Sequence, residues 1–320
     1  MCLITVIICT FNRAEILDET LKSWLSVEAT CPDVELLVVD NNSTDYTQQV
    51  VNAFHPQCPN LMRCVFEPAP GLSNARNRGI KEAHGQIVAF VDDDVCFEPN
   101  WLVEILKAFS DNPEISCVGG KSIPKFEAPV PAWMTEDLYD FYGSTRSGDH
   151  DKIMQFPEHP FGLNMAFRKE VFEQVGDFNI TLGRIKNSLL SNEELDFFYR
   201  VNKAGLKVFY ASKALLYHRI PTDRMDKNWI LSRRYWQGIS DVVYWQTTYP
   251  RNRLILSLKT LLISKKIIIL YGRKITNKMF PSNTAYSFRQ QQALYRFLGI
   301  ARQNVLEILP FLKSWLPKID

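Results

Sequence analysis

Short apolar runs alternate with segments of helical periodicity through the first 120 residues of this chain. The runs 3–9, 34–39 and 87–91 predict buried β-strands, and apolar residues recur at helical spacing between them. Strands that are apolar on both faces are typical of a parallel sheet covered by helices on both sides. We therefore expect an α/β fold with a mostly parallel central sheet and a Rossmann-like first half.

Weaker patterns place further elements along the chain. We expect strands at 63–66, 115–118 and 207–210, and helices at 44–54, 73–83, 99–109, 169–175 and 193–204. Residues 121–160 are instead rich in Pro, Gly, aromatic and charged residues, and this segment is too long for an ordinary connection. We expect it to be either a lid or an insertion that shapes a substrate site.

Charge divides the chain into two regions, 1–220 and 221–320. From Arg219 onward there are 18 Lys and Arg against 5 Asp and Glu, a balance of +13, whereas residues 1–218 carry 19 against 30, a balance of −11. The basic, Trp- and Leu-rich second region is predicted to be mainly helical. Its charge favours an anionic partner such as phospholipid head groups or a phosphorylated lipid acceptor. A solvated basic face is the alternative.

Two features bear on localisation. The apolar segment 254–271 contains three lysines, so it lacks the roughly 20 uninterrupted apolar residues of a spanning helix, and we expect an interfacial amphipathic helix. The seven cysteines form no C-x-x-C pair, which favours a reducing compartment over a disulfide framework or a zinc cluster. With no signal segment expected at the start, we predict a cytoplasmic protein. Peripheral attachment to the inner face of the plasma membrane is left open.

Three consecutive carboxylates, those of Asp92, Asp93 and Asp94, follow the apolar strand that ends at Val91. Adjacent acids repel one another, so such a cluster at the carboxyl end of a strand suggests a bound cation. The acidic triplet therefore predicts a site for a metal–nucleotide complex.

Two more strands are followed by polar residues. Thr10, Asn12 and Arg13 end the first, and Asp40 and Asn42 end the second. Each has a structural explanation as a cap or a turn residue. In open α/β sheets, however, ligands lie outside the carboxyl ends of the strands, so three polar ends on one edge predict a binding site.

A glycine turn opens the helix expected at 73–83. Gly71 is followed by Ser73 and Arg76 in the run GLSNARNRG. A helix N-terminus with arginines nearby is suited to a diphosphate, although an ordinary capped surface helix is an equal alternative.

The chain resembles family 2 glycosyltransferases over roughly residues 3–220. The motifs that carry the resemblance occur in the family's order and read TVIICTFNR, LLVVDNNSTD, GLSNARNRGI, VAFVDDD, FGLNMAFRKEVFEQVGDFN, NEELDFFYRVNKAGLKVFY and LLYHR. The resemblance implies an A-type glycosyltransferase fold, a single Rossmann-like domain for the nucleotide sugar that is followed by an acceptor region. We expect residues 1–220 to be the nucleotide-sugar-binding and catalytic domain and residues 221–320 to be the helical, basic region. The chain is also similar to bacterial enzymes of cell-surface and exopolysaccharide assembly.

Carried over position by position, the resemblance implies roles for the polar strand ends. Thr10 and Asn12 would line the nucleoside pocket, and Asp40 would read the uracil edge. Asp92 would face the ribose or the sugar. Asp94 would bind a Mg²⁺ or Mn²⁺ ion that bridges the diphosphate, whose charge grows as the glycosidic bond breaks.

The resemblance also fills in the rest of the nucleotide and metal site. His218 matches a histidine that closes the metal or diphosphate site in some relatives, although a lone histidine after a strand is more often structural. Asp92 is a second candidate metal ligand. The remaining candidate donor-binding residues are Arg13, Asn42, Gly71, Ser73, Arg76 and Asp93.

Transfer with inversion needs a carboxylate that takes the proton of the acceptor hydroxyl. The family places it in an acidic pair, usually Glu-Asp, that opens a helix, and this chain has Glu193-Glu194 there. Glu194 is then the predicted base. Alternatively, Glu194 could form a capping box with Ser191. Asp196 is the reserve candidate, although Arg200 at i+4 could engage it in an ordinary helix ion pair.

The run 160–165 resembles the glycine-bearing loop that packs under the donor sugar in the family. Gly162 would permit a close approach of the backbone, and Asn164 could bond a sugar hydroxyl. A tight turn before a core helix is the alternative.

These features predict a metal-dependent inverting glycosyltransferase. It would move a sugar from a nucleoside diphosphate, expected to be UDP, to a glycan or lipid-linked acceptor in polysaccharide biosynthesis. A non-catalytic nucleotide-sugar-binding or scaffold protein is the alternative from another class. A nucleotidyltransferase would be expected to carry a Gly-rich phosphate loop after the first strand, where this chain has Cys-Thr-Phe-Asn-Arg. The basic tail has no recognised nucleic-acid-binding module, so we expect no nucleic-acid partner.

Overall fold

The computed structural model describes residues 3–28, 34–58, 61–186, 188–249 and 285–308, and the interfacial helix expected at 254–271 lies outside them. The chain divides into two compact units. The first consists of Met1–Val130, Met134–Ile180 and Glu193–Thr222, and the second of Pro131–Trp133, Thr181–Asn192 and Asp223–Asp320. Two short segments from before residue 220 therefore group with the second, helical unit.

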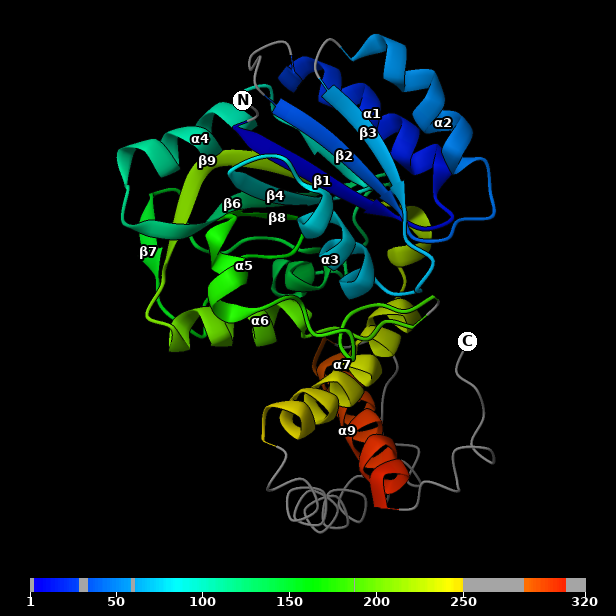
Figure 1. Ribbon diagram of the computed structural model, residues 1–320. Coiled ribbons are helices and arrows are strands. Elements are labelled where there is room, and N and C mark those ends of the chain that lie inside the picture. The colour runs from blue at the N-terminus through cyan, green and yellow to red at the C-terminus, as the bar shows by residue number, and fades with distance from the viewer. Residues whose placement is uncertain (1–2, 29–33, 59–60, 187, 250–284, 309–320) are drawn as a thin grey trace, which may run out of the picture. The chain divides into compact units, whose positions relative to one another are not determined.

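Four parallel strands form the Rossmann-like half of the first unit (Figure 1). They lie in the order β3-β2-β1-β4 and span Leu61–Phe66, Val34–Asp40, Ile4–Thr10 and Ile87–Asp92. Nearly every residue of β1, β2 and β4 is buried, because helices cover both faces of the sheet. The continuous apolar runs of the sequence correspond to these strands, and the α/β architecture is confirmed.

Beyond β4 the strands of the sheet are no longer all parallel. Within the described residues nine strands form one sheet, which continues from β4 in the order β8-β6-β9-β5, while β7 pairs with β9. These strands span Asn164–Arg168, Ile115–Phe126, Lys207–Ile220, Val95–Phe97 and Lys152–Met154, respectively. β8 runs antiparallel to both β4 and β6, whereas β6 and β9 are parallel to each other.

Three sequence predictions for the part of the sheet beyond β4 are wrong. β6 and β9 extend well past the predicted ends at 118 and 210, because they pair with each other along almost their whole length. The segment 121–160 is therefore no single lid, since it contains the end of β6, a 3-10 helix at Glu136–Tyr142 and β7. Strand β8 starts at Asn164, where we expected a loop.

The described α-helices of the first unit lie in two layers against the sheet (Figure 1). Helices α1 (Ala14–Glu28), α2 (Thr47–Phe54) and α4 (Trp101–Asp111) share one buried apolar cluster with the sheet. Helices α3 (Leu72–Glu82), α5 (Glu170–Val175) and α6 (Glu193–Lys203) share a second apolar cluster formed by side chains of the opposite parity. α3 and α6 thus lie on the same face, and their first turns contribute residues to the site described below.

The described residues from 221 onward are mainly helical, as predicted. Helices α7 (Lys227–Thr248) and α9 (Ala285–Ile308) cross where Gly238 meets the carbonyl oxygen of Arg296. A Cβ atom on Gly238 would lie 1.9 Å from that oxygen, so the crossing requires glycine. Asp241 also pairs with Arg296 at 2.6 Å. Of the described helices, none is both long and apolar enough to cross a membrane.

Candidate active site

The acidic triplet lies at the turn between β4 and β5, at the carboxyl edge of the parallel strands. Thr10 Oγ1 donates to Asp93 Oδ2 at 2.8 Å, while the guanidinium of Arg13 bonds both Asp93 and, at 2.8 Å, Asp94 Oδ2. Burial raises the pKa of Asp93 to about 6. The charge of Arg13 opposes this shift, and the repulsion of Asp94 adds to it. Thr10 and Arg13 are thus turned toward the triplet, where they hold two buried carboxylates in place. The Asp92 side chain, by contrast, is 37% exposed.

Pairing of β5 with β9 brings His218 to Asp94. Val95 is the register partner of His218, whose Nε2 lies 3.2 Å from Asp94 Oδ1. The Nδ1 atom of His218 lies 2.6 Å from the carbonyl oxygen of Tyr142. Because a carbonyl oxygen can only accept, Nδ1 carries a hydrogen, and a second proton or a cation must separate Nε2 from the carboxylate. Burial alone would lower the pKa of His218, but the charge of Asp94 outweighs it and raises this pKa.

The donor set around Asp94 fits a divalent cation that is completed by a diphosphate. Among the described residues, no three His, Cys, Asp or Glu side chains gather into a set that could hold a metal alone. Asp94 Oδ1 and His218 Nε2 nevertheless converge, and His218 gives its other N–H to a backbone carbonyl, as metal-binding histidines commonly do. Asp92, two residues before Asp94 in the chain, adds an accessible carboxylate.

The loops after β1 and β2 are bonded to each other. Thr44 N–H donates to Asn12 Oδ1 at 2.7 Å, and Asn12 N–H donates to Ser43 Oγ at 3.0 Å. Ser43 N–H in turn donates to Asp40 Oδ1 at 2.9 Å. Asn12 and Asn42 both have a positive φ, 52° and 69°, which asparagine tolerates better than most residues. The structure therefore brings the polar ends of β1 and β2 together, while their contact with a nucleoside stays a prediction.

An asparagine that we did not predict positions the start of α3. Asn41 Oδ1 accepts from Gly71 N–H at 2.7 Å, and its amide donates to the carbonyl oxygens of Glu67 and Ala69. Gly71 has φ 131°, a conformation that favours glycine, and Ser73 behind it is buried. The signal was available, because Asn41 lies inside the polar end of the second predicted strand.

Arg76 on α3 forms a buried ion cluster with the acidic pair of α6. Its Nη1 lies 3.2 Å from an oxygen of Glu193 and of Glu194, and its Nη2 donates to Glu194 Oε1 at 3.2 Å. The same Nη2 lies 3.9 Å from Asp92 Oδ1. The Arg76 side chain is only 2% exposed, so its guanidinium faces carboxylates and not, as predicted, an open diphosphate site. One guanidinium links the triplet to a pair that lies 100 residues further along the chain.

Gly162 packs against this cluster. A Cβ atom at this position would lie 2.1 Å from Glu194 Oε1 and 2.3 Å from Arg76 Nη2, closer than any side chain allows. The backbone at Gly162 therefore lies close to Glu194 and Arg76, while its approach to a donor sugar stays a prediction. Any residue larger than glycine would displace Glu194 or Arg76.

Two predicted site residues have structural roles instead. Asn164 is buried, its Oδ1 accepts from Trp101 Nε1 at 2.9 Å, and its amide donates to the carbonyl oxygens of Lys121 and Ala214. The predicted bond to a sugar hydroxyl is wrong, because the Asn164 side chain already serves the core. Asp196 accepts from Arg200 Nε at 3.1 Å and Nη2 at 3.0 Å, so the reserve base is in the ordinary helix ion pair.

The capping-box alternative for Glu194 is not formed. The Ser191 N–H that it would engage donates to Ser240 Oγ at 2.9 Å. The Glu194 carboxylate accepts from Arg76. Burial alone would raise the pKa of Glu194, but the charge of Arg76 and hydrogen bonds to the ionised form outweigh it and hold this pKa below its usual range.

Residues 5–176 match the model of the family described as glycosyl transferase family 2, which is more than half of the chain. The chain belongs to this family. It is thus a glycosyltransferase, and the family resemblance and enzyme class predicted from the sequence are confirmed.

Two curated relatives align over most of their length. A glucosyl-dolichyl phosphate glucuronosyltransferase of Haloferax volcanii is 27% identical, over 78% of this chain and 80% of its own. The succinoglycan biosynthesis protein ExoM of Rhizobium meliloti is 25% identical, over 72% of this chain and 71% of its own. Among solved structures, the mannosyltransferase PcManGT from Pyrobaculum calidifontis, in complex with GDP-Man and Mn²⁺, has a TM-score of 0.63. It is 18% identical and covers 95% of this chain and 87% of its own, a likeness that shows the fold.

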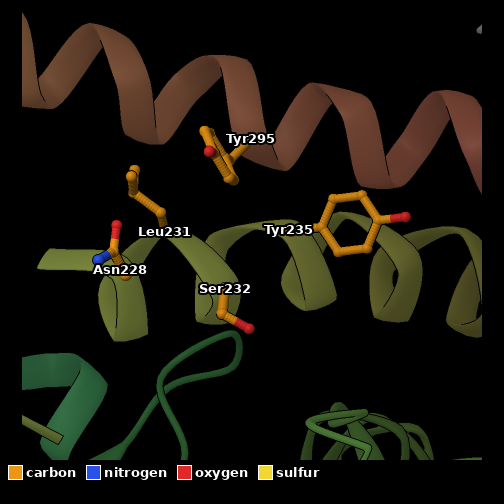
Figure 2. Close-up of a pocket in the computed structure, with 5 residues that line it drawn as sticks. All are labelled: Asn228, Leu231, Ser232, Tyr235 and Tyr295. Atoms are coloured by element: carbon orange, nitrogen blue, oxygen red, sulfur yellow. The ribbon is translucent and has the colours of Figure 1, made fainter. Parts of the chain in front are cut away.

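A cavity also lies within the helical unit, between α7 and α9 (Figure 2). Its volume is about 330 Å³, and its lining residues are Asn228, Leu231, Ser232, Tyr235 and Tyr295. None of the residues predicted for the site lines it. The cavity is a feature that the sequence analysis did not anticipate.

Proposed function

We propose that this glycosyltransferase works with inversion, with Glu194 as its base and a divalent cation at Asp94. One observation carries the proposal. Arg76 lies 3.2 Å from Glu194 and 3.9 Å from Asp92, so the base and the donor-side triplet are separated by a single guanidinium group. An inverting transferase needs such proximity, because the base must reach an acceptor hydroxyl beside the donor's anomeric carbon.

The chemistry follows from these positions. Glu194 takes the proton of the acceptor hydroxyl, whose oxygen forms a bond to the anomeric carbon. The bond from that carbon to the diphosphate breaks, and its electron pair leaves with the diphosphate. A bound Mg²⁺ or Mn²⁺ would stabilise the charge on that leaving group. Asp94 and His218 would hold the ion, with Asp92 beside them, while Arg13 fixes the orientation of Asp94.

The donor that we propose is a UDP-sugar. The carboxylate of Asp40 and the joined loops after β1 and β2 support a nucleoside at the carboxyl edge, and a carboxylate can accept the imide N–H of uracil. A carboxylate can also accept from guanine, and PcManGT, which has a similar fold, is described in complex with GDP-Man. The test must therefore compare both nucleotides.

The proposed acceptor is a glycan or a lipid-linked sugar of polysaccharide biosynthesis. The names of the two curated relatives, one acting on glucosyl-dolichyl phosphate and one in succinoglycan biosynthesis, support this class. The balance of +13 from Arg219 onward supports a cytoplasmic enzyme that meets an anionic membrane surface peripherally. Flotation with anionic and neutral vesicles tests that part, and equal recovery with both would contradict it.

The experiment for the whole proposal is a release assay. The full chain is incubated with a panel of UDP- and GDP-sugars in Mg²⁺, in Mn²⁺ or in a chelator, and free nucleoside diphosphate is measured. We expect metal-dependent release from one donor, and its loss in Glu194→Gln. Donor binding without release in every condition would favour the scaffold alternative.

A further inference from the structure

The buried cluster of Arg76, Glu193 and Glu194 is not balanced in charge. It holds one guanidinium against two carboxyl groups, and the nearby Asp92 adds a third at 3.9 Å. The side chains of Arg76 and Glu193 are only 2% and 4% exposed. An excess negative charge in such a place is strongly unfavourable, and a shared proton removes it.

The contacts distinguish the two glutamates. Both Nη1 and Nη2 of Arg76 donate to Glu194 Oε1, whereas Nη1 alone donates to Glu193, at its Oε1. The buried Glu193 Oε2 has no hydrogen-bond donor among the described residues. An ionised carboxylate would leave a charged oxygen there without a donor, whereas the protonated acid carries no charge. The Glu194 side chain is 19% exposed and therefore the accessible member of the pair.

Taking Glu194 as the proposed base, we infer that Arg76 and Glu193 act as positioning residues that keep one proton on Glu193 and leave Glu194 ionised. Arg76 then binds the base and not the diphosphate. Gly162 is required for this contact, because the absence of a side chain lets Glu194 and Arg76 lie against its backbone.

The charged groups that face the pair agree with this assignment. They are Arg76 from α3, Asp92 from β4 and His159 from the segment before β8. Burial, followed by the charge of Glu194, raises the pKa of Glu193 to about 8, while that of Glu194 is lowered. Glu194 is therefore ionised and able to accept a proton at neutral pH, whereas Glu193 would become charged only in mild alkali.

Infrared difference spectroscopy tests the proton's location without any turnover. At near-neutral pH the wild-type protein should show the C=O stretch of a buried protonated carboxyl group. Glu193→Gln should lose this band, and Glu194→Gln should retain one from Glu193. If Glu193→Gln keeps the band and Glu194→Gln loses it, the proton is on the other residue and the inference is overturned. This readout stays valid even if no donor sugar is ever transferred.

Kinetics test the positioning role of Arg76. Arg76→Lys should lower kcat by about 10-fold or more and move the acid limb of the pH–rate profile upward, because Glu194 Oε1 loses the two guanidinium donors that favour its ionised form. UDP affinity measured by calorimetry should stay within about twofold of wild type. The matched control is Arg78→Lys on the same helix, because Arg78 pairs with Glu82 at 3.0 Å. Weaker UDP binding with an unmoved pH profile would identify Arg76 as a diphosphate ligand and refute the inference.

A folding defect in Arg76→Lys would not prevent the test. Glu193→Gln replaces a neutral acid by a group of the same shape, so its kcat should exceed that of Glu194→Gln by at least about 10-fold. Its profile should also lack the alkaline limb that the ionisation of Glu193 produces. Equal losses in the two folded glutamine variants would overturn the assignment.

Discussion

The sheet of the first unit carries a buried ion cluster at each edge, and the two are built differently. At the amino edge, Glu35 of β2 is fully buried, and it accepts from Thr5 Oγ1 at 2.6 Å and from His84 N–H at 3.0 Å. Arg63 Nη1 donates to its other oxygen at 2.7 Å. Both oxygens of the buried Glu35 carboxylate thus have donors, although Arg63 also pairs with the more exposed Glu82 at 3.2 Å.

The cluster at the carboxyl edge is incomplete by the same measure. Two carboxyl groups share Arg76 there, and Glu193 Oε2 has no donor among the described residues. A saturated ion cluster resists any change of protonation, whereas an unsaturated one can exchange a proton with a ligand. The difference indicates which edge of the sheet is structural and which is chemical.

The largest effect is expected from Glu35→Ala, which would leave Arg63 without its buried partner. Removing one member of a buried pair typically costs about 3–5 kcal/mol, so the unfolding free energy should fall by that order. Turnover per folded molecule should not change, because Glu35 lies at the opposite edge from the triplet. Denaturant unfolding measures the loss, and Glu82→Ala, which removes a more exposed partner of Arg63, is the control and should cost less than about 1 kcal/mol. A loss of activity without a loss of stability would break the comparison.

Glu194→Gln should have the opposite profile. The amide keeps the shape of the side chain but cannot take a proton, so turnover should fall by about 10²-fold or more, while stability and UDP affinity change little. Steady-state release of nucleoside diphosphate and thermal unfolding measure the two quantities. Near-normal turnover would exclude Glu194 as the base, and Asp196, tied to Arg200, would be a poor substitute.

The pair of Asp94 and His218 extends the comparison, because a proton or a cation must separate Nε2 from Oδ1 at 3.2 Å. We expect UDP to bind about 10-fold or more weakly when divalent metal is chelated, and equally weakly in Asp94→Ala with metal present. Calorimetry with and without Mn²⁺ gives both values. Equal affinity in all conditions would mean that this pair holds no metal.

The sequence was informative where the relevant contacts are local. Strands β1, β2 and β4 are continuous apolar runs, and the polar residues that end them are next in the chain. Strand β8 was not predicted because it is short. The second half of β9 was not predicted because it alternates between buried and half-buried residues, a pattern set by pairing with distant strands. The pattern of apolar runs alone could not reveal that pairing.

The same limit applies to the site. The meeting of Asp94 with His218 depends on the register of β5 against β9, and that of Arg76 with Glu194 depends on α3 and α6 lying on one face of the sheet. Asn164 was misassigned because its partner Trp101 lies 63 residues earlier. The residue types at the site could be predicted, but their partners could not.

The smallest expected effect is a pH dependence of opposite sign at the two edges. Burial alone would raise the pKa of Glu35, but hydrogen bonds from Thr5, His84 and Arg63 lower it below 4.5. The contribution of Glu35 to stability is therefore lost as the pH falls through its pKa in the folded protein. Glu193 has a raised pKa of about 8, so its contribution is complete below about 4.5 and is lost as the pH rises toward 8. In unfolding experiments the stability gap between wild type and Glu35→Gln should therefore narrow in acid. The unfolding free energy of Glu193→Gln should instead rise relative to that of the wild type as the pH increases from about 5 to about 8. If the two variants respond to pH in the same direction, the predicted difference between the two edges is wrong.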